Sequence, residues 1–301
     1  MKKTDNNAIS LIGTVVKSLS GFYYLDYGGA VYETKPRGSF RFAEISPIVG
    51  DKVRFSPIDG TKGVIDEILP RSNCLKRPAV SNVDKIIIVS SFKNPAPDTY
   101  LIDRLTAIAE FNGIKPVIVF NKSDTGDFAD FERIYINAGF NTYVVSALDK
   151  ASLTGLKKEF ENCISVMAGN TGVGKSSLLN ALFGTLNLKT GEVSNALGRG
   201  RHTTRHTELL KNDVGGYVID TPGFSSIDQL ENRFEFKNSL PDCFKDFSPY
   251  TDLCRFSDCS HISEKGCAVL EAVSLGKIEK TRHRSYTMLY NELKGANNWE
   301  K

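Results

Sequence analysis

Long apolar runs are missing from this sequence. Nowhere in its 301 residues do roughly 20 consecutive apolar residues occur, the length that a helix needs to span a bilayer. The first residues, M-K-K-T-D-N-N, also lack the apolar segment of a secretory signal peptide. We therefore expect a cytoplasmic protein with no membrane partner.

Cysteine is scarce, and the excess of one charge sign is small. Six cysteines in a chain of this length do not indicate a disulfide scaffold, and a formal net charge of +3 does not by itself indicate a nucleic-acid-binding protein. Residues 1–80 nevertheless hold 12 Lys and Arg against 8 Asp and Glu. Residues 189–205 add Arg199, Arg201 and Arg205 against one acidic residue. Such patches favour an acidic partner, although an ordinary solvated surface explains them as well.

Residues 1–70 have the composition of a small all-β domain. Runs typical of strands lie at 9–16, 22–27, 30–34, 52–56 and 63–68, and turns that contain glycine or proline separate them. Five short strands in this length are typical of an OB-fold barrel, which often binds RNA. An SH3-like barrel, or a small sheet with no role in nucleic-acid binding, is the alternative.

Residues 71–232 alternate between strands and helices. Apolar runs at 85–91, 116–120, 142–146, 164–168 and 217–219 are typical of parallel strands that are buried on both faces. Residues 98–112 have helical spacing, with Asp98 as the expected N-cap and Gly113 as the stop. We expect an α/β domain with a doubly wound sheet here. Residues 233–301 predict a mostly helical domain, with helices near 267–275 and 278–293.

A phosphate-binding loop lies between a strand and a helix. G-N-T-G-V-G-K-S, residues 169–176, fits the pattern G-x-x-x-x-G-K-[ST] and has the correct flanking segments. Lys175 would pair with the β- and γ-phosphates of a nucleotide, and the hydroxyl of Ser176 would ligate Mg²⁺. A glycine-rich turn with a chance Lys-Ser pair is the minor alternative in this context.

The motif D-T-P-G, residues 220–223, ends the run at 217–219. The carboxylate of Asp220 is placed to hold Mg²⁺ through water, and the backbone N–H of Gly223 is placed to bind the γ-phosphate. A lone D-x-x-G is usually just a turn. Its position after a phosphate loop makes the motif informative.

The run at 116–120 ends in N-K-S-D, residues 121–124. Guanine offers two N–H donors that one carboxylate accepts together, and adenine offers no such pair, so Asp124 would select GTP over ATP. Asn121 would tie the loops together, and the stem of Lys122 would cover the base. Ser146 and Ala147 resemble the companion motif whose backbone N–H reads the guanine O6. An ATP-dependent protein with a chance N-K-S-D is the alternative.

The guanine motif precedes the phosphate loop, whereas it follows that loop in most GTPases. A circular permutation explains this order, because closing the original termini and opening a new break leaves every strand in its place in the sheet. The expected ligands are GTP or GDP with Mg²⁺. The residues expected to bind them are Asn121, Lys122, Ser123, Asp124, Ser146, Ala147, Gly169, Asn170, Thr171, Gly172, Val173, Gly174, Lys175, Ser176, Ser177 and Asp220.

The permuted order, the barrel-like start and a Cys/His tail resemble a bacterial family of circularly permuted GTPases that depend on the small ribosomal subunit. The resemblance covers essentially the whole chain and includes P-I-V-G-D-K-V (47–53) and G-R-G-R-H-T-T (198–204). It implies an OB domain, a permuted GTPase domain and a zinc domain. It also implies a monomer that binds the small subunit and its rRNA with GTP, acts late in subunit maturation and leaves after hydrolysis. A GTP-gated binding protein with negligible hydrolysis is the alternative.

The switch motif of that family maps onto Thr203 and Thr204, one of which would ligate Mg²⁺ and sense the γ-phosphate. Phe224 follows Gly223 where a water-orienting glutamine would stand, so the resemblance implies His202 as the catalytic substitute. A surface histidine beside a basic loop is the alternative. The expected catalytic residues are Lys175, His202, Thr203, Thr204 and Gly223, and the expected magnesium site comprises Ser176, Thr203 and Asp220.

Three cysteines and a histidine gather near the end of the chain: Cys254, Cys259, His261 and Cys267. Three thiolates and one imidazole suit a closed, tetrahedral zinc site of the structural kind. The spacing departs from the C-x-x-C knuckle, so reduced cysteines without a metal are the alternative. The basic candidates for contact with rRNA are Lys35, Arg37, Arg41, Arg54, Arg199, Arg201, Arg282 and Arg284.

Overall fold

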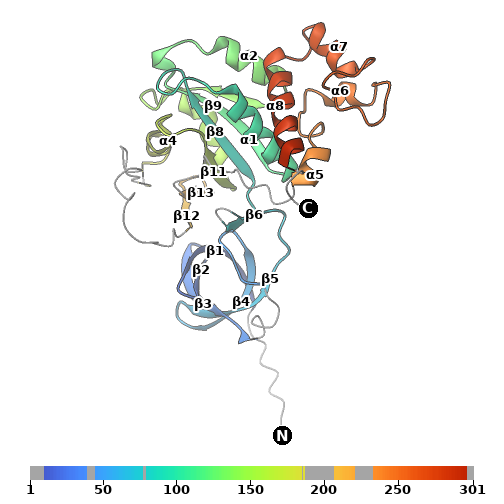
Figure 1. Ribbon diagram of the computed structural model, residues 1–301. Coiled ribbons are helices and arrows are strands. Elements are labelled where there is room, and N and C mark those ends of the chain that lie inside the picture. The colour runs from blue at the N-terminus through green and yellow to red at the C-terminus, as the bar shows by residue number, and fades with distance from the viewer. Residues whose placement is uncertain are drawn as a thin grey trace, which may run out of the picture.

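A barrel, a central α/β domain and a helical C-terminal region follow one another along the chain (Figure 1). The computed structural model describes residues 10–38, 45–76, 79–184, 186, 207–220 and 233–296. Within these ranges, the length and polarity of the helices rule out a membrane-spanning helix.

The N-terminal barrel is closed. Its strands are β1 (Leu11–Leu19), β2 (Phe22–Tyr27), β3 (Ala30–Pro36), β4 (Lys52–Asp59) and β5 (Lys62–Ile68). They follow the order β1-β2-β3-β5-β4, β4 pairs back to β1, and β3 and β5 run parallel. This is the strand order of an OB-like barrel, and its closure decides against the alternative of a small sheet. Val15, Leu25, Val53, Phe55 and Ile65 fill its interior.

The central domain is built on a sheet with the order β10-β9-β8-β11-β13-β12. Its strands are β8 (Lys85–Ser91), β9 (Lys115–Asn121), β10 (Asn141–Val144), β11 (Ile164–Ala168), β12 (Glu208–Lys211) and β13 (Tyr217–Asp220). All are parallel except β12, which is antiparallel to β13. The sequence predicts the five parallel strands, and β12 is the strand that it does not predict.

Helices cover both faces of this sheet. On one face, α1 (Thr99–Phe111) and α2 (Ala129–Asn137) share a core with Ile86 and Ile88. On the other, α3 (Leu153–Lys157) and α4 (Lys175–Leu182) share a core with Ile87 and Val89. Successive side chains of a strand point to opposite faces, so a sheet that is covered on both sides needs unbroken apolar runs.

The expected ends of α1 are confirmed. The side chain of Asp98 accepts a hydrogen bond of 3.1 Å from the backbone N–H of Leu101, as an N-cap does. After the helix, Gly113 takes a positive φ of 66°. Short 3-10 turns, η2 (Ser123–Thr125) and η3 (Lys158–Phe160), complete the connections around the sheet.

Two contacts join the barrel to the central domain. A hairpin of β6 (Cys74–Lys76) and β7 (Ala79–Ser81) connects them along the chain. In addition, β1 pairs with β12, with Lys17 opposite Glu208, so the barrel continues the central sheet (Figure 1).

The C-terminal region packs on the outer side of α1. It contains α5 (Arg233–Asn238), α6 (Ser248–Thr251), α7 (Ala268–Ser274) and the long α8 (Lys280–Ala296). Ala107 and Ile108 of α1 share a core with Phe236, Phe244 and Tyr286 of this region. The helical character that the sequence predicts for this region is thus confirmed.

The prediction that Arg282 of α8 contacts rRNA is wrong. Arg282 is 1% exposed, and its guanidinium donates hydrogen bonds of 2.7 Å to Asp103 of α1 and to Asp246. It also lies over the rings of Phe140 and Phe244. Two carboxylates from other elements offset the cost of burying its charge, so it is a core residue. Arg284, two positions later, is exposed.

Candidate nucleotide site and cysteine–histidine cluster

The three loop motifs of the central domain lie at one edge of the sheet. Asn121 ends β9, residues 146–147 follow β10, and the glycine-rich loop follows β11. These strands are parallel, so their carboxyl ends meet at the same edge. Asp220 ends β13, which is parallel to β11 with Val166 opposite Ile219. The backbone of Asp220 therefore lies beside the start of the glycine-rich loop.

Asn121 joins the motifs to one another. Its side chain is buried, and its amide donates a hydrogen bond of 3.0 Å to the carbonyl of Val173. Its side-chain oxygen accepts a hydrogen bond of 3.2 Å from the backbone N–H of Ala147. One amide group thus connects the guanine motif, its companion and the phosphate loop.

Lys122 makes a second connection to the phosphate loop. Its backbone is left-handed, with a φ of 64°, and its ammonium donates a hydrogen bond of 2.8 Å to the carbonyl of Gly172. The aliphatic stem therefore stretches from one loop to the other. This is the placement that a side chain needs in order to cover a base held between the loops.

The carboxylate of Asp124 is oriented by Ser146. The hydroxyl of Ser146 donates to Oδ1 of Asp124 at 2.6 Å and accepts from the backbone N–H of Leu148 at 3.2 Å. The neighbouring Ser123 donates its backbone N–H to the carbonyl of Val145 at 3.0 Å. A fixed carboxylate is what selective recognition of a base requires.

Ser152 supports this arrangement, and the motifs gave no sign of it. Its hydroxyl accepts the backbone N–H of Ser146 at 3.1 Å and donates to the carbonyl of Asp149 at 2.7 Å. Its position, six residues after Ser146, belongs to no nucleotide-binding pattern. A preference of serine for the start of a helix was the available signal, since Ser152 directly precedes α3.

Two positions of the phosphate loop require glycine, because the backbone there lies very close to other atoms of the protein. At Gly169, with a φ of 126°, a Cβ would lie 2.1 Å from the carbonyl oxygen of Val89. At Gly174, with a φ of 92°, it would lie 2.5 Å from the side-chain nitrogen of Asn121. Any other residue would force the loop away from the sheet.

Lys175 begins α4 and points back over the loop. Its ammonium donates to the carbonyls of Gly169 and Asn170 at 2.7 and 2.8 Å. Burial lowers the pKa of Lys175. No carboxylate among the described residues pairs with it. A partly buried ammonium without an anionic partner suits a phosphate group.

The same loop offers groups that fit Mg²⁺. Magnesium prefers a few oxygen ligands from the protein together with substrate phosphates. Ser176 and Ser177 lie in the first turn of α4, with Ser176 half-buried and Ser177 exposed, and Asp220 ends the adjacent β13. A serine at the start of α4 and an aspartate at the end of the neighbouring strand are residue types that match that preference.

Several expected site residues lie outside the described ranges. They are His202, Thr203, Thr204 and Gly223 of the catalytic set and Arg41, Arg199 and Arg201 of the basic set. Among the other basic candidates, Lys35 and Arg37 are exposed on the barrel, and Arg54 is half-exposed. Arg37 pairs with Asp66, and Arg54 pairs with Glu67.

The cysteines and the histidine of the C-terminal region meet in space. One potential ligand atom from each of Cys254, Cys259, His261 and Cys267 lies within 4.8 Å of all the others. Tetrahedral zinc with its usual bond lengths separates two sulfurs by about 3.8 Å and a sulfur from a nitrogen by about 3.6 Å. The sulfurs of Cys254 and Cys267 are 3.9 Å apart, and His261 Nδ1 lies 3.5 and 3.6 Å from them. The cluster therefore fits zinc.

The surroundings of the cluster also suit a metal. Burial raises the pKa of Cys259 to about 12 and raises that of Cys267, so an added cation is needed to hold them as thiolates. Burial lowers the pKa of His261, which favours the neutral imidazole that binds metals. The backbone around the ligands is held from α8, where His283 contacts the carbonyl of His261 at 2.7 Å and Tyr286 donates to that of Ser260 at 2.9 Å.

Comparison with known protein families gives two matches along the chain. Residues 68–230 match the model of the RsgA GTPase, and residues 12–65 match that of the RsgA N-terminal domain. A protein of Ruminiclostridium cellulolyticum, named small ribosomal subunit biogenesis GTPase RsgA, is 44% identical over 291 residues and 94% of both chains. A protein of the same name from Clostridium acetobutylicum is 40% identical over 96% of this chain and 99% of its own.

Two solved structures have the same architecture. The crystal structure of YloQ, described as a circularly permuted GTPase, superposes with a TM-score of 0.82 at 32% identity, over 98% of this chain and 99% of that one. YjeQ from Thermotoga maritima gives a TM-score of 0.80 at 35% identity, over 95% of this chain and 99% of that one. The permuted order inferred from the motifs is thereby confirmed.

Proposed function

The chain belongs to the RsgA family of GTPases, and on this basis we propose that it binds the small ribosomal subunit with GTP, acts in a late step of its maturation and leaves after hydrolysis. It is a GTP hydrolase of ribosome biogenesis. One observation carries the proposal most directly. The buried amide of Asn121 connects the base-reading and phosphate-binding loops, which places both loops to hold one nucleotide.

Different residues of the site bind different parts of the nucleotide. Asp124, held by Ser146, reads the two N–H donors of guanine, and Lys122 covers the base. The backbone of the loop at 169–176 surrounds the phosphates. Lys175 exchanges its two carbonyl partners for phosphate oxygens, because an anionic acceptor suits a partly buried ammonium better than a neutral one.

Magnesium and the catalytic groups belong at the same edge of the sheet. Ser176 and Asp220 would hold Mg²⁺ together with one of Thr203 and Thr204, and the ion would offset charge on the phosphates. Gly223 would bind the γ-phosphate through its backbone N–H, and His202 would orient the attacking water. In support, Asp220 ends a strand that lies directly beside β11.

Zinc has a structural role in this proposal. The four ligands leave no open position for a substrate, and two of them lie in the core of the C-terminal region with Phe247 and Tyr286. The metal then closes the chain between residues 254 and 267. It fixes the surface that this region presents to its partner.

Three units share the contact with the ribosome in this proposal, residues 1–70, 71–232 and 233–301. Exposed basic residues such as Lys35 and Arg284 would contact rRNA, so the affinity should fall as salt rises. We place the protein in the cytoplasm as a monomer. A monomer suffices because every expected nucleotide ligand comes from a single chain.

The decisive experiment is GTP turnover with and without purified small subunits. The proposal requires faster turnover with the subunit, and a rate that the subunit leaves unchanged would refute it. Asp124→Asn tests the base-reading role separately, since an amide pairs with xanthine better than with guanine. A variant that still prefers guanine nucleotides would remove Asp124 from that role.

A further inference from the structure

Three residues lie in register across the border between the barrel and the central sheet. Lys17 of β1 is opposite Glu208 of β12, and Glu208 is opposite Asp220 of β13. The ammonium of Lys17 lies 3.0 Å from the carboxylate of Glu208. Neighbouring strands are about 4.8 Å apart. The barrel is therefore only two strand spacings from the proposed magnesium ligand.

A second contact holds the other end of the β12–β13 pair. Asp26 of β2 accepts a hydrogen bond of 2.7 Å from Lys211 and one of 2.9 Å from the hydroxyl of Tyr217. Its other oxygen accepts the backbone N–H of Gly29 at 3.2 Å, which fixes the carboxylate to the turn of its own hairpin. Polar contacts from the barrel thus hold both ends of the β12–β13 pair.

Between the two contacts the interface is not closely packed. A groove of about 480 Å³ lies beside the β1–β12 pair, and its lining includes the apolar residues Val16, Leu19, Val31 and Leu209. Relative motion of domains within a chain is expected unless their interface is large and hydrophobic. On this side of the barrel, the half-buried Val16 of β1 packs against the core of the central domain. A shift of the barrel here therefore disturbs the edge of that core rather than its interior.

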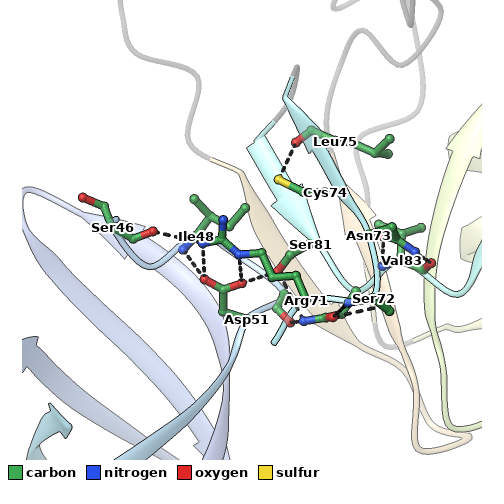
Figure 2. Close-up of polar contacts among 12 residues, drawn as sticks. Ser46, Ile48, Asp51, Arg71, Ser72, Asn73, Cys74, Leu75, Ser81 and Val83 are labelled. Carbon is green, nitrogen blue, oxygen red and sulfur yellow. Dashed lines mark hydrogen bonds and ion pairs between the residues drawn. The ribbon is translucent and has the colours of Figure 1, made fainter. Parts of the chain in front are cut away.

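The barrel has a fixed attachment at its other joint (Figure 2). Asp51 is fully buried and accepts hydrogen bonds from both Nε and Nη2 of Arg71, from the Ser81 hydroxyl at 2.6 Å and from the backbone N–H of Ile48. At Gly50 a Cβ would lie 2.1 Å from the carbonyl oxygen of Ser81. This joint holds the barrel near one point, about which it can turn.

The C-terminal region is attached in a different way. Its contact with the central domain is a buried core with Arg282 bonded to Asp103 of α1 at 2.7 Å, both side chains being 1% exposed. Moving this region would expose an ion pair and several aromatic rings. It should therefore follow the central domain as one body.

We infer that Lys17 and Asp26 are positioning residues, through which the orientation of the barrel is coupled to the nucleotide state of the central domain. Strand β12 begins four residues after Thr204, and β13 ends in Asp220, the first residue of D-T-P-G. The two strands are therefore connected directly to the two motifs proposed to respond to the γ-phosphate. The barrel, rather than the zinc region, is the part that changes its placement on hydrolysis. This inference rests on the proposed function.

Charge reversal at the exposed ion pair tests the coupling. Lys17→Glu and Glu208→Lys are compared with the double variant that carries both changes. The quantity measured is the ratio of two affinities for the small subunit, one with a non-hydrolysable GTP analogue and one with GDP. Partly exposed ion pairs are weak, so each single change should reduce the ratio roughly two- to fivefold without unfolding the protein. The double variant should restore it.

The pair Lys157–Asp213 is the matched control. It has the same chemistry and nearly the same exposure, and Asp213 lies in the turn between β12 and β13, but the pair does not touch the barrel. Lys157→Glu should leave the ratio unchanged.

The outcomes separate coupling from a simple loss of charge. If Lys17 only contacted rRNA, both affinities would fall together, the ratio would stay constant and the inference would be overturned. Failure of the double variant to restore the ratio would also overturn it. A wild-type ratio of one would instead refute the proposed release after hydrolysis.

Discussion

The side-chain amide of Asn121 donates a hydrogen bond of 3.0 Å to the carbonyl of Val173, which lies 52 residues later in the chain. The following residue, Gly174, leaves room for this amide because it has no side chain. The two loops are in contact although the guanine motif precedes the phosphate loop in the chain. Three of the predictions below, at Gly174, Arg282 and Glu159, concern contacts of this kind, between residues that are distant in sequence.

Gly174→Ala should weaken the binding of GDP roughly tenfold or more, because the left-handed backbone is strained and the new methyl group displaces Asn121. Calorimetric titration with GDP measures the effect. Gly139→Ala is the control, since Gly139 has a similar φ of 83° and no atom within 4 Å of the added Cβ. Equal GDP affinity in Gly174→Ala and the wild type would contradict the account of the loop contact.

Ser152→Ala should reduce GDP affinity by roughly three- to tenfold, because the backbone N–H of Ser146 loses its acceptor and the loop that orients Asp124 relaxes. The equilibrium dissociation constant for GDP measures this effect. Ser152→Thr keeps the hydroxyl and should restore binding. If both variants bind like the wild type, Ser152 has no part in base recognition.

Metal analysis should find one zinc per chain, and Cys254→Ser should lose it together with thermal stability of the C-terminal region. The reason is that structural zinc contributes directly to the stability of a small region. Cys74→Ser is the control, because Cys74 is exposed and lies outside the cluster. Purified protein with less than stoichiometric zinc, but an intact fold, would argue against the site.

Arg282→Leu should lower the free energy of unfolding by about 3–5 kcal/mol, because Asp103 and Asp246 remain buried without their cation. Burial already raises the pKa of Asp103 against the effect of Arg282, so loss of the arginine should raise it further. Urea denaturation measures the stability. Arg284→Leu, on the exposed side of the same helix, should change it by less than about 0.5 kcal/mol.

Glu159→Gln should destabilise the protein at neutral pH but progressively less in acid. Burial by itself raises the pKa of Glu159. Hydrogen bonds from Lys85, Tyr143 and Asn141 lower it by a larger amount, so the pKa lies below its ordinary value. A depressed carboxyl pKa stabilises the fold above the unfolded value of about 4.3, and that contribution is lost as the pH falls through the folded value.

The measurement for Glu159 is the difference in unfolding free energy between the variant and the wild type at several pH values. Glu161→Gln, an exposed neighbour, is the control and should show no such dependence. A difference that stays constant below pH 4 would contradict the assignment. Nucleotide affinity should not change, because Lys85 and Asn141 begin their strands at the edge of the sheet opposite the nucleotide site.

The sequence by itself determined the features that depend on neighbouring residues. The glycines and the lysine of the phosphate loop, the unbroken apolar runs of the parallel strands and the N-cap Asp98 are all local requirements of backbone geometry and burial. The order of the motifs was enough to infer the permutation, because parallel strands must bring their carboxyl ends to one edge whatever the order of the chain.

Only the tertiary structure decided the roles of Arg282, Ser152 and β12. Arg282 is a core residue because the carboxylates of Asp103 in α1 and of Asp246 pair with its guanidinium. The four residues of β12 are too few to give a periodic signal, and the strand is defined by its pairing with β13 and with Lys17 of the barrel. Such contacts join distant parts of the chain, so their energies depend on packing that no local pattern records.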